Sequence, residues 1–214
     1  MTSQDTIEIP EVGLVVLVGA SGSGKSTFAH RHFLPTEIVS SDRCRALISD
    51  DETDQSVTAE AFALLREIID KRLQVGRLTV VDATSAKRED RKSLLELARK
   101  WDVLATAIVF DLPIEVCFER NQQRSDRTIP EHAIRRQHKA VRRSAKGLRK
   151  ERFSRVHTID SVTQLEAVGI ERISCGPIEE TTWAHSTSLA TSTAAPTSSC
   201  CCLTSSDTTR PLRR

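Results

Sequence analysis

A glycine-rich segment near the N-terminus constrains the fold of this chain more than any other feature. The apolar run from Leu14 to Val18 has the character of a buried strand, and GASGSGKST, residues 19–27, follows it directly. This segment matches G-x-x-x-x-G-K-[ST] between a strand and a helix, which is the context that the motif requires. Its glycines let the backbone N–H groups converge on phosphate oxygens at the start of the next helix. The sequence therefore predicts a phosphate-binding loop, with ligand contacts from Gly19, Ser21, Gly22, Ser23, Gly24, Lys25, Ser26 and Thr27.

The loop motif also predicts the ligand. Lys25 is expected to reach the β- and γ-phosphates of a nucleoside triphosphate, and the Ser26 hydroxyl is expected to hold Mg²⁺. ATP or GTP with Mg²⁺ is thus the expected cofactor set. The motif does not identify the acceptor of the phosphoryl group.

Further apolar runs rich in β-branched residues predict strands over residues 37–40, 78–82, 103–110 and 155–159. Apolar residues at helical spacing predict helices over Thr58–Val75 and Arg88–Lys100. Alternating strands and helices indicate an α/β fold: a parallel sheet with right-handed crossovers and helices on both faces. Ligands of such sheets bind at the carboxyl ends of the strands.

Composition excludes several classes of protein. No apolar run approaches the 18 or so residues of a membrane span, and residues 1–10 are polar and acidic, unlike a signal peptide. We therefore expect a cytoplasmic protein. The six Cys have neither metal-ligand spacing nor the pattern of a disulfide framework, so we interpret them as incidental.

Polar residues at the end of the second expected strand are candidates for the acceptor site. Asp42 at a strand end facing the phosphate-binding loop would accept the proton of an attacking hydroxyl. Arg45, one helical turn further on, would hold a phosphate of the acceptor. Position alone is equally consistent with Asp42 as the N-cap of the following helix.

The third expected strand also ends in a carboxylate. Asp82 follows Val80 and Val81, as the Walker B Asp that touches Mg²⁺ directly or through water follows its strand. A helix or turn cap is the alternative. We favour the site role, since strand ends on this side of the sheet face the ligand.

The near-neutral net charge of +2 conceals a strongly basic segment. In residues 120–155, Lys and Arg exceed Asp and Glu by ten. Arg120 and Arg124 lie four residues apart, on one helical face, and Arg127 precedes the break at Pro130. We interpret these three as a lid that closes over the triphosphate and neutralises transition-state charge, against the alternative of a solvated helix face.

A helix beginning near Pro130 is expected to carry the remaining basic residues. Some are simply solvated, but the excess of charge also suits a polyanionic acceptor. Phe153 is the only aromatic residue of the segment, so contacts to nucleic acid would be mainly to phosphates. The helix residues concerned are Arg135, Arg136, Lys139, Arg142, Arg143, Lys146, Arg149 and Lys150.

Four segments together carry a family resemblance: GASGSGKSTFA, PTEIVSSDRCRALISDDETDQS, KRLQVGRLTVVDAT and FDLPIEVCFERNQQRSDR. They resemble the N-terminal P-loop kinase domain of bacterial polynucleotide kinase-phosphatase, an RNA end-healing enzyme, over about residues 7–174. The resemblance implies transfer of the γ-phosphate of a nucleoside triphosphate to the 5′-OH end of RNA or DNA. It also implies an RNA-repair methyltransferase as a partner.

The resemblance assigns roles to individual residues. It implies Lys25 and Ser26 as triphosphate and Mg²⁺ ligands, Asp42 as the general base and Arg45 as a clamp on an acceptor phosphate. It further implies Arg120, Arg124 and Arg127 as lid arginines, and Asp82 and Thr84 as supporting residues of the site.

The C-terminal segment departs from that family, in which a metallophosphatase domain follows the kinase. Residues 181–209 are dominated by Ser, Thr and Ala without an apolar period, so we place the kinase domain at 1–174 and a tail at 175–214. Read one base out of frame, Thr182–Ala195 permits the phosphatase motif Gly-Asp-x-His-Gly. The tail is therefore expected to be a frameshift product or, alternatively, a disordered linker.

Two other functions suit the same motifs. One is a small-molecule kinase, and the other is a nucleic-acid-binding ATPase that transfers no phosphate to an acceptor. The segment from Ser41 to Arg45 distinguishes them, because an ATPase needs no base there. A metabolite kinase, in turn, would not need the basic helix.

Overall fold

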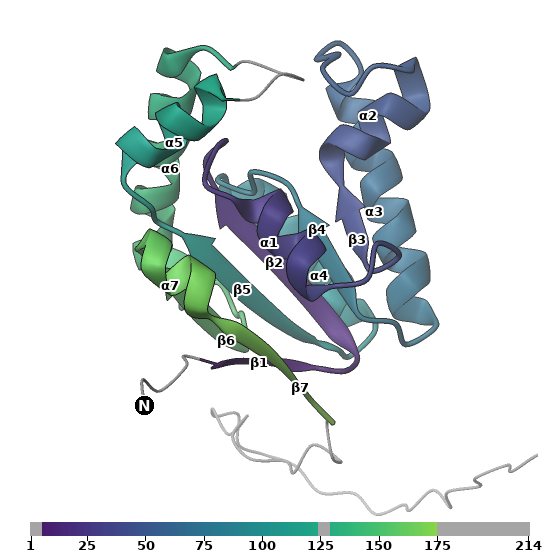
Figure 1. Ribbon diagram of the computed structural model, residues 1–214. Helices are drawn as coiled ribbons and strands as arrows, with labels where there is room; N and C mark the ends of the chain where they lie inside the picture. The colour runs from purple at the N-terminus through teal and green to yellow at the C-terminus, as the bar shows by residue number, and fades with distance from the viewer. Residues whose placement is uncertain (1–5, 124–128, 175–214) are drawn as a thin grey trace, which may run out of the picture. The chain divides into compact units, whose positions relative to one another are not determined.

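The protein is described by a computed structural model, which covers residues 6–123 and 129–174 apart from the side chain of Lys146. The expected tail at 175–214 and the expected lid residues Arg124 and Arg127 lie outside this part of the chain. Within it, five parallel strands form the main sheet in the order β3-β4-β2-β5-β6. They span Gly13–Gly19 (β2), Ile38–Ser40 (β3), Thr79–Asp82 (β4), Leu104–Phe110 (β5) and Arg155–Ile159 (β6). Figure 1 shows the strands of this sheet lying side by side.

Helices connect these strands along the chain. The connections run through α1 (Lys25–His32), α2 (Ser41–Ser49), α3 (Thr58–Gln74), α4 (Arg88–Lys100), α5 (Ile114–Gln122) and α6 (Glu131–Leu148). All pairings in the main sheet are parallel, as the alternation of strands and helices predicts. The α/β fold with a parallel sheet is therefore confirmed.

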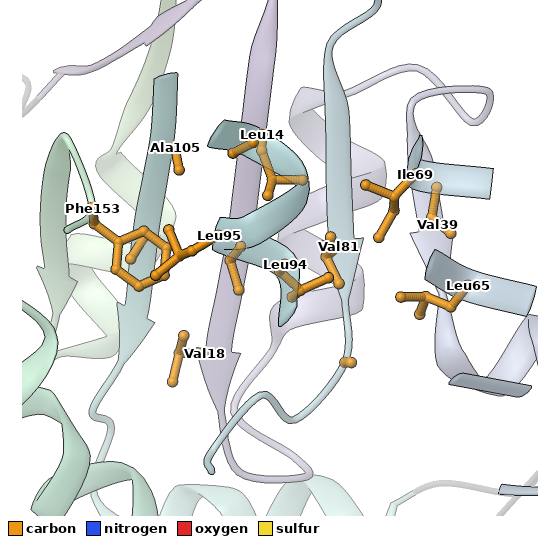
Figure 2. Packing of buried hydrophobic residues seen from close by; sticks show 14 of the residues in the cluster. Leu14, Val18, Val39, Leu65, Ile69, Val81, Leu94, Leu95, Ala105 and Phe153 are labelled. Atoms are coloured by element: carbon orange, nitrogen blue, oxygen red, sulfur yellow. The ribbon is translucent and has the colours of Figure 1, made fainter. Parts of the chain in front are cut away.

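Alternate residues of β2 face two separate cores. Leu14, Val16 and Val18 pack with α3, α4 and α6, whereas Val15 and Leu17 pack with α1 and with the last elements of the domain. Figure 2 shows Leu94 of α4 beside Val81 and Leu95 of α4 beside Phe153, with Leu65 and Ile69 of α3 close to Val39. Both faces of the central strand are thus buried, which explains its uninterrupted apolar sequence.

A second, two-stranded sheet was absent from the expectations. It pairs β1 (Thr6–Pro10) with β7 (Gly169–Ile173), and α7 (Val162–Ala167) precedes β7. Ile7 and Ile9 of β1 are buried, but β7 is half-exposed and holds two charged residues between its apolar ones. The five residues of β7 contain too few apolar side chains to predict a strand from the sequence. Only the pairing with β1, far away in the sequence, defines β7 as a strand.

One expected helix boundary is corrected. α6 ends at Leu148, since the N–H groups of Lys150 and Glu151 form turns with Gly147 and Leu148, so Arg149 and Lys150 follow the helix. The described part of α5 ends at Gln122, and Arg124, which we expect on the same helical face as Arg120, lies outside the described residues. None of the helices that the structure describes is both long enough and apolar enough to cross a bilayer.

Candidate active site at the carboxyl edge of the sheet

The predicted phosphate-binding loop lies between β2 and α1, as its motif requires. Gly22 and Gly24 have φ values of 81° and 90°, a region that side-chain-bearing residues rarely adopt. A Cβ on Gly22 would lie 2.3 Å from the carbonyl oxygen of Cys117 on α5, and one on Gly19 would lie 2.6 Å from Ser23 Oγ. The motif glycines are therefore demanded both by backbone conformation and by close packing around the loop.

Lys25 is the first residue of α1 and is almost fully buried. Its Nζ donates a hydrogen bond of 2.8 Å to the carbonyl oxygen of Ala20, which holds the side chain across the loop. Ser26 follows at the start of the same helix, and both residues line one cavity at the carboxyl edge of the sheet. This edge lies near the helix N-terminus, where the electrostatic field favours anions.

Asp42 and Arg45 lie on the first turns of α2, which begins directly after β3. The N-cap of α2 is Ser40, whose Oγ accepts a hydrogen bond from the N–H of Arg43. Asp42 is therefore not the cap, which removes the alternative left open by the sequence. Its carboxylate forms an ion pair with the Arg45 guanidinium, and both residues line the cavity that holds Lys25 and Ser26.

Arg45 is buried to an extent unusual for an arginine, with 6% of its surface exposed. Its Nε–H is buried and has no hydrogen-bond partner among the residues that the structure describes. An unused buried donor costs free energy unless a ligand satisfies it. The Nε–H of Arg45 is thus a buried donor that the ion pair with Asp42 does not use.

Asp82 and Thr84 lie at and just after the end of β4, between β2 and β3. Asp82 is 7% exposed and pairs in register with Leu17 and with Ser40, so it stands between the phosphate-binding loop and α2. The carbonyl oxygen of Thr84 accepts a hydrogen bond from the N–H of Gly19. Both residues line the same cavity as Lys25 and Asp42.

Arg120 lies on α5 and faces the phosphate-binding loop from the other side. Its Nη1 lies 3.0 Å from the position of a Cβ on Gly24, and it lines a second cavity of about 390 Å³ with Gly22, Gly24 and Thr27. In Figure 1, α5 and α6 stand on one side of the loop, and α2 and α3 stand on the other. The expected site residues within the described chain therefore surround the loop from three directions.

Gln137 is a site residue that the sequence did not reveal. From α6, its Oε1 accepts a hydrogen bond of 2.9 Å from the N–H of Ser21 in the loop, and its side chain lines the cavity with Lys25. This N–H belongs to the set expected to bind phosphate. A glutamine within a basic helix gives no sequence signal of such a contact, because only the packing of α6 over the loop brings the two together.

The donor set fits a nucleotide with Mg²⁺. Converging backbone N–H groups, Lys25 and Arg45 suit phosphate oxygens, while the Ser26 hydroxyl and the Asp82 carboxylate suit Mg²⁺, which keeps several waters and takes one or two carboxylates. No three His, Cys, Asp or Glu side chains cluster as an all-protein metal site within residues 6–123 and 129–174.

Comparison with known proteins identifies the family. The family model described as an AAA domain (AAA_33) matches residues 14–148. This chain belongs to that AAA-domain family. The matched residues extend from the first residues of β2 to the end of α6 and include the phosphate-binding loop, Asp42, Asp82 and Arg120. Binding of a nucleotide with Mg²⁺ is general among P-loop kinase domains of this kind.

Solved structures share the fold of this AAA domain. A chain of the Pnkp1/Rnl/Hen1 RNA repair complex is 24% identical, with a TM-score of 0.56 over 65% of this chain and 47% of that one. The AvrRxo1-ORF1:-ORF2 complex with ATP contains a chain that is 17% identical, with a TM-score of 0.51 over 66% and 50%. This chain thus spans about half the length of each. No curated protein matches it. These likenesses show the P-loop kinase fold.

Proposed function

We propose that this chain is a 5′-OH polynucleotide kinase, which transfers the γ-phosphate of a nucleoside triphosphate to the 5′-OH end of RNA or DNA in nucleic-acid end repair. One observation carries the proposal: Asp42 and Arg45 line the same cavity as Lys25, Ser26 and Asp82. The proposed base and the proposed phosphate clamp would thus lie beside the predicted γ-phosphate site. This combination suits an acceptor that carries both a hydroxyl and a phosphate.

The loop and its neighbours position the donor. Backbone N–H groups of residues 19–27 and Lys25 Nζ hold the phosphates, with Lys25 leaving its contact to Ala20 as the phosphates enter. Ser26 and Asp82 would hold Mg²⁺, which when bound neutralises charge on the β- and γ-phosphate oxygens. Arg120 approaches the loop opposite these residues, where it would stabilise charge on the transferring group.

Asp42 and Arg45 act on the acceptor. Asp42 accepts the proton of the 5′-OH as its oxygen attacks phosphorus, and the nucleoside diphosphate departs. Arg45 remains paired with Asp42 through Nη1 and directs other N–H groups of its guanidinium to an acceptor phosphate oxygen. Because the ion pair fixes both side chains, the hydroxyl and the adjacent phosphate are aligned together.

The charge of α6 and its flanks supports a polyanionic acceptor. Arg135, Arg136, Lys139, Arg142 and Arg143 are all exposed on α6. Such a helix would attract a nucleic-acid backbone with a strong dependence on salt. The lid roles of Arg120, Arg124 and Arg127 belong to this proposal, as does an RNA-repair methyltransferase as partner. The likeness in fold to a chain of an RNA repair complex is consistent with it.

A small-molecule kinase and an ATPase without an acceptor are the competing functions. Phosphate transfer from labelled ATP or GTP should be measured with a 5′-OH oligonucleotide, with small alcohols, and with water alone. We expect transfer to the oligonucleotide far above the other two. Transfer only to a small alcohol, or hydrolysis alone, contradicts the proposal.

The substitution Asp42→Asn tests the base while preserving shape. We expect the kcat for transfer to fall by about 10² to 10⁴, since an amide cannot take the proton. Asp50→Asn is the matched control: Asp50 ends the same helix, is exposed, and has a φ of 58° that Asn tolerates. Transfer by Asp42→Asn at the rate of this control would remove Asp42 from the mechanism.

A further inference from the structure

A third cavity, which we call the side cavity, adjoins the cavity that holds Lys25 and Asp42. It has a volume of about 650 Å³ and lies between α3, α4 and the end of β4. The two cavities share five lining residues, namely Gln55, Phe62, Ala83, Ser85 and Asp90. A molecule bound in the side cavity can therefore extend as far as Asp42. Its size falls in the range of small-molecule sites.

The lining of the side cavity is asymmetric. Its floor is apolar and buried, formed by Leu65, Val81, Ala83 and Leu94, and the half-buried ring of Phe62 forms one wall. Figure 2 shows Leu65, Val81 and Leu94 grouped where α3 and α4 approach β4. An apolar floor with an aromatic wall favours a flat ring over a sugar or a polyol.

The polar rim carries two carboxylates and one guanidinium, that of Arg66. Glu89 and Asp90 lie on the first turn of α4 and line the cavity beside Ser93. The carboxylate of Asp90 accepts no hydrogen bond from the residues that the structure describes, and burial raises its pKa above the ordinary value. The two carboxylates outnumber the single cation Arg66, which disfavours a phosphorylated group, whereas one carboxylate is a good acceptor for an exocyclic amine or a ring N–H. Charge and shape together indicate an uncharged heteroaromatic ring with hydrogen-bond donors.

We propose that this side cavity binds the base of the acceptor's terminal nucleoside, stacked on Phe62 with its polar edge toward Asp90. This inference rests on the proposed function, which it deepens by giving the acceptor a base-bearing end. The nucleobase of the acceptor, together with its phosphates, then positions the 5′-OH at Asp42.

The first measurement uses paired oligonucleotides that differ only at the 5′ residue, which carries a base in one and is abasic in the other. For the unmodified protein we expect kcat/KM to be about tenfold higher with the base, in line with stacking of one base on an aromatic ring. Phe62→Leu keeps the cavity wall apolar but removes the ring, so it should lower kcat/KM on the base-bearing acceptor about tenfold. It should lower kcat/KM on the abasic acceptor by a much smaller factor.

Leu64→Ala is the matched control, because Leu64 lies on α3 and packs on the same core but does not line the cavity. It should preserve the preference for a base. A preference near one in the unmodified protein overturns the inference, as does an equal effect of Phe62→Leu on both acceptors.

The second measurement separates this inference from the proposed function. Binding of free, uncharged nucleosides is followed by the chemical shifts of the protein, with and without Phe62→Leu. Nucleoside binding that Phe62→Leu abolishes supports the base site even if no oligonucleotide is phosphorylated, in which case the proposed function fails alone. Absence of nucleoside binding, together with equal transfer to both oligonucleotides, overturns the base site while the kinase function stands.

Discussion

At the scale of single residues, the phosphate-binding loop shows why a motif can prescribe local geometry. Gly22 combines a positive φ with a close approach to the carbonyl oxygen of Cys117, so no side chain fits there. Gly76 also has a positive φ, of 66°, but nothing lies within 4 Å of its would-be Cβ. A comparison of substitutions at the two glycines therefore distinguishes the cost of steric contact from the cost of backbone conformation.

Gly22→Ala is expected to destabilise the fold by more than Gly76→Ala, which carries only a left-handed backbone cost of about 1–3 kcal/mol. The methyl group added at Gly22 must also displace α5 or distort the loop, so this variant should lose nucleotide binding together with stability. Urea unfolding and a nucleotide titration measure both effects. Equal losses of stability for the two variants would mean that α5 yields to the methyl without cost.

At the scale of elements, a buried ion pair ties α4 to the segment that follows α6. Arg91 is 0% exposed and donates to both carboxylate oxygens of Glu151 at 2.8 and 2.7 Å. Its Nη1 also donates to the carbonyl oxygen of Ser85, one residue after Thr84 of the candidate site. The pair therefore fixes the loop at the end of β4.

Arg91→Met is expected to lower the free energy of unfolding by about 3–5 kcal/mol, because Glu151 keeps its charge in a buried place. Lys92→Met on the same helix is the control. Lys92 pairs with Glu96 at 3.9 Å with both side chains largely exposed, so the change should stay within about 1 kcal/mol. Equal effects in denaturant unfolding would contradict the assigned strength of the buried pair.

At the scale of the whole molecule, two histidines make stability depend on pH. Burial lowers the pKa of His32 and of His157, with the charges of Arg31 and Arg155 adding to the effect. The Nε2 atoms of both are buried without a hydrogen-bond partner among the described residues. The folded state therefore resists protonation that the unfolded chain accepts.

Because the folded pKa values lie below the ordinary value of 6.5, this contribution is fully present above pH 6.5 and is lost as the pH falls through the folded values. We expect urea midpoints to decline from about pH 7 toward about pH 5. His157→Gln should flatten the decline, whereas His132→Gln, at an exposed position on α6, should leave it unchanged. A decline that both variants share would place the titration elsewhere.

The domain boundary is also a property of the whole chain. Residues 175–214 lack the apolar period of a packed element, so a chain ending at residue 174 should unfold at the same urea concentration and transfer phosphate at the same rate as the full chain. A loss of either would give the tail a role in the domain. Sequencing of the coding DNA tests the frameshift, which requires an open phosphatase-like reading one base out of frame.

The sequence by itself determined the α/β class, the strands of the main sheet and the position of the phosphate-binding loop. These depend on local patterns: apolar runs buried on both faces, helical spacing, and glycines at fixed offsets. It also nominated Asp42 and Asp82, because strand ends on one side of a parallel sheet share an edge.

Only the tertiary structure decided which distant groups meet at that edge. The pairing of β1 with β7, the contact of Gln137 with the loop, and the side cavity at Phe62 join residues far apart in the chain. Ser40, not Asp42, is the N-cap of α2. The sequence alone could not show which of these neighbouring polar residues caps the helix. Local sequence fixes backbone conformation, whereas contacts across the fold depend on how helices pack over the sheet.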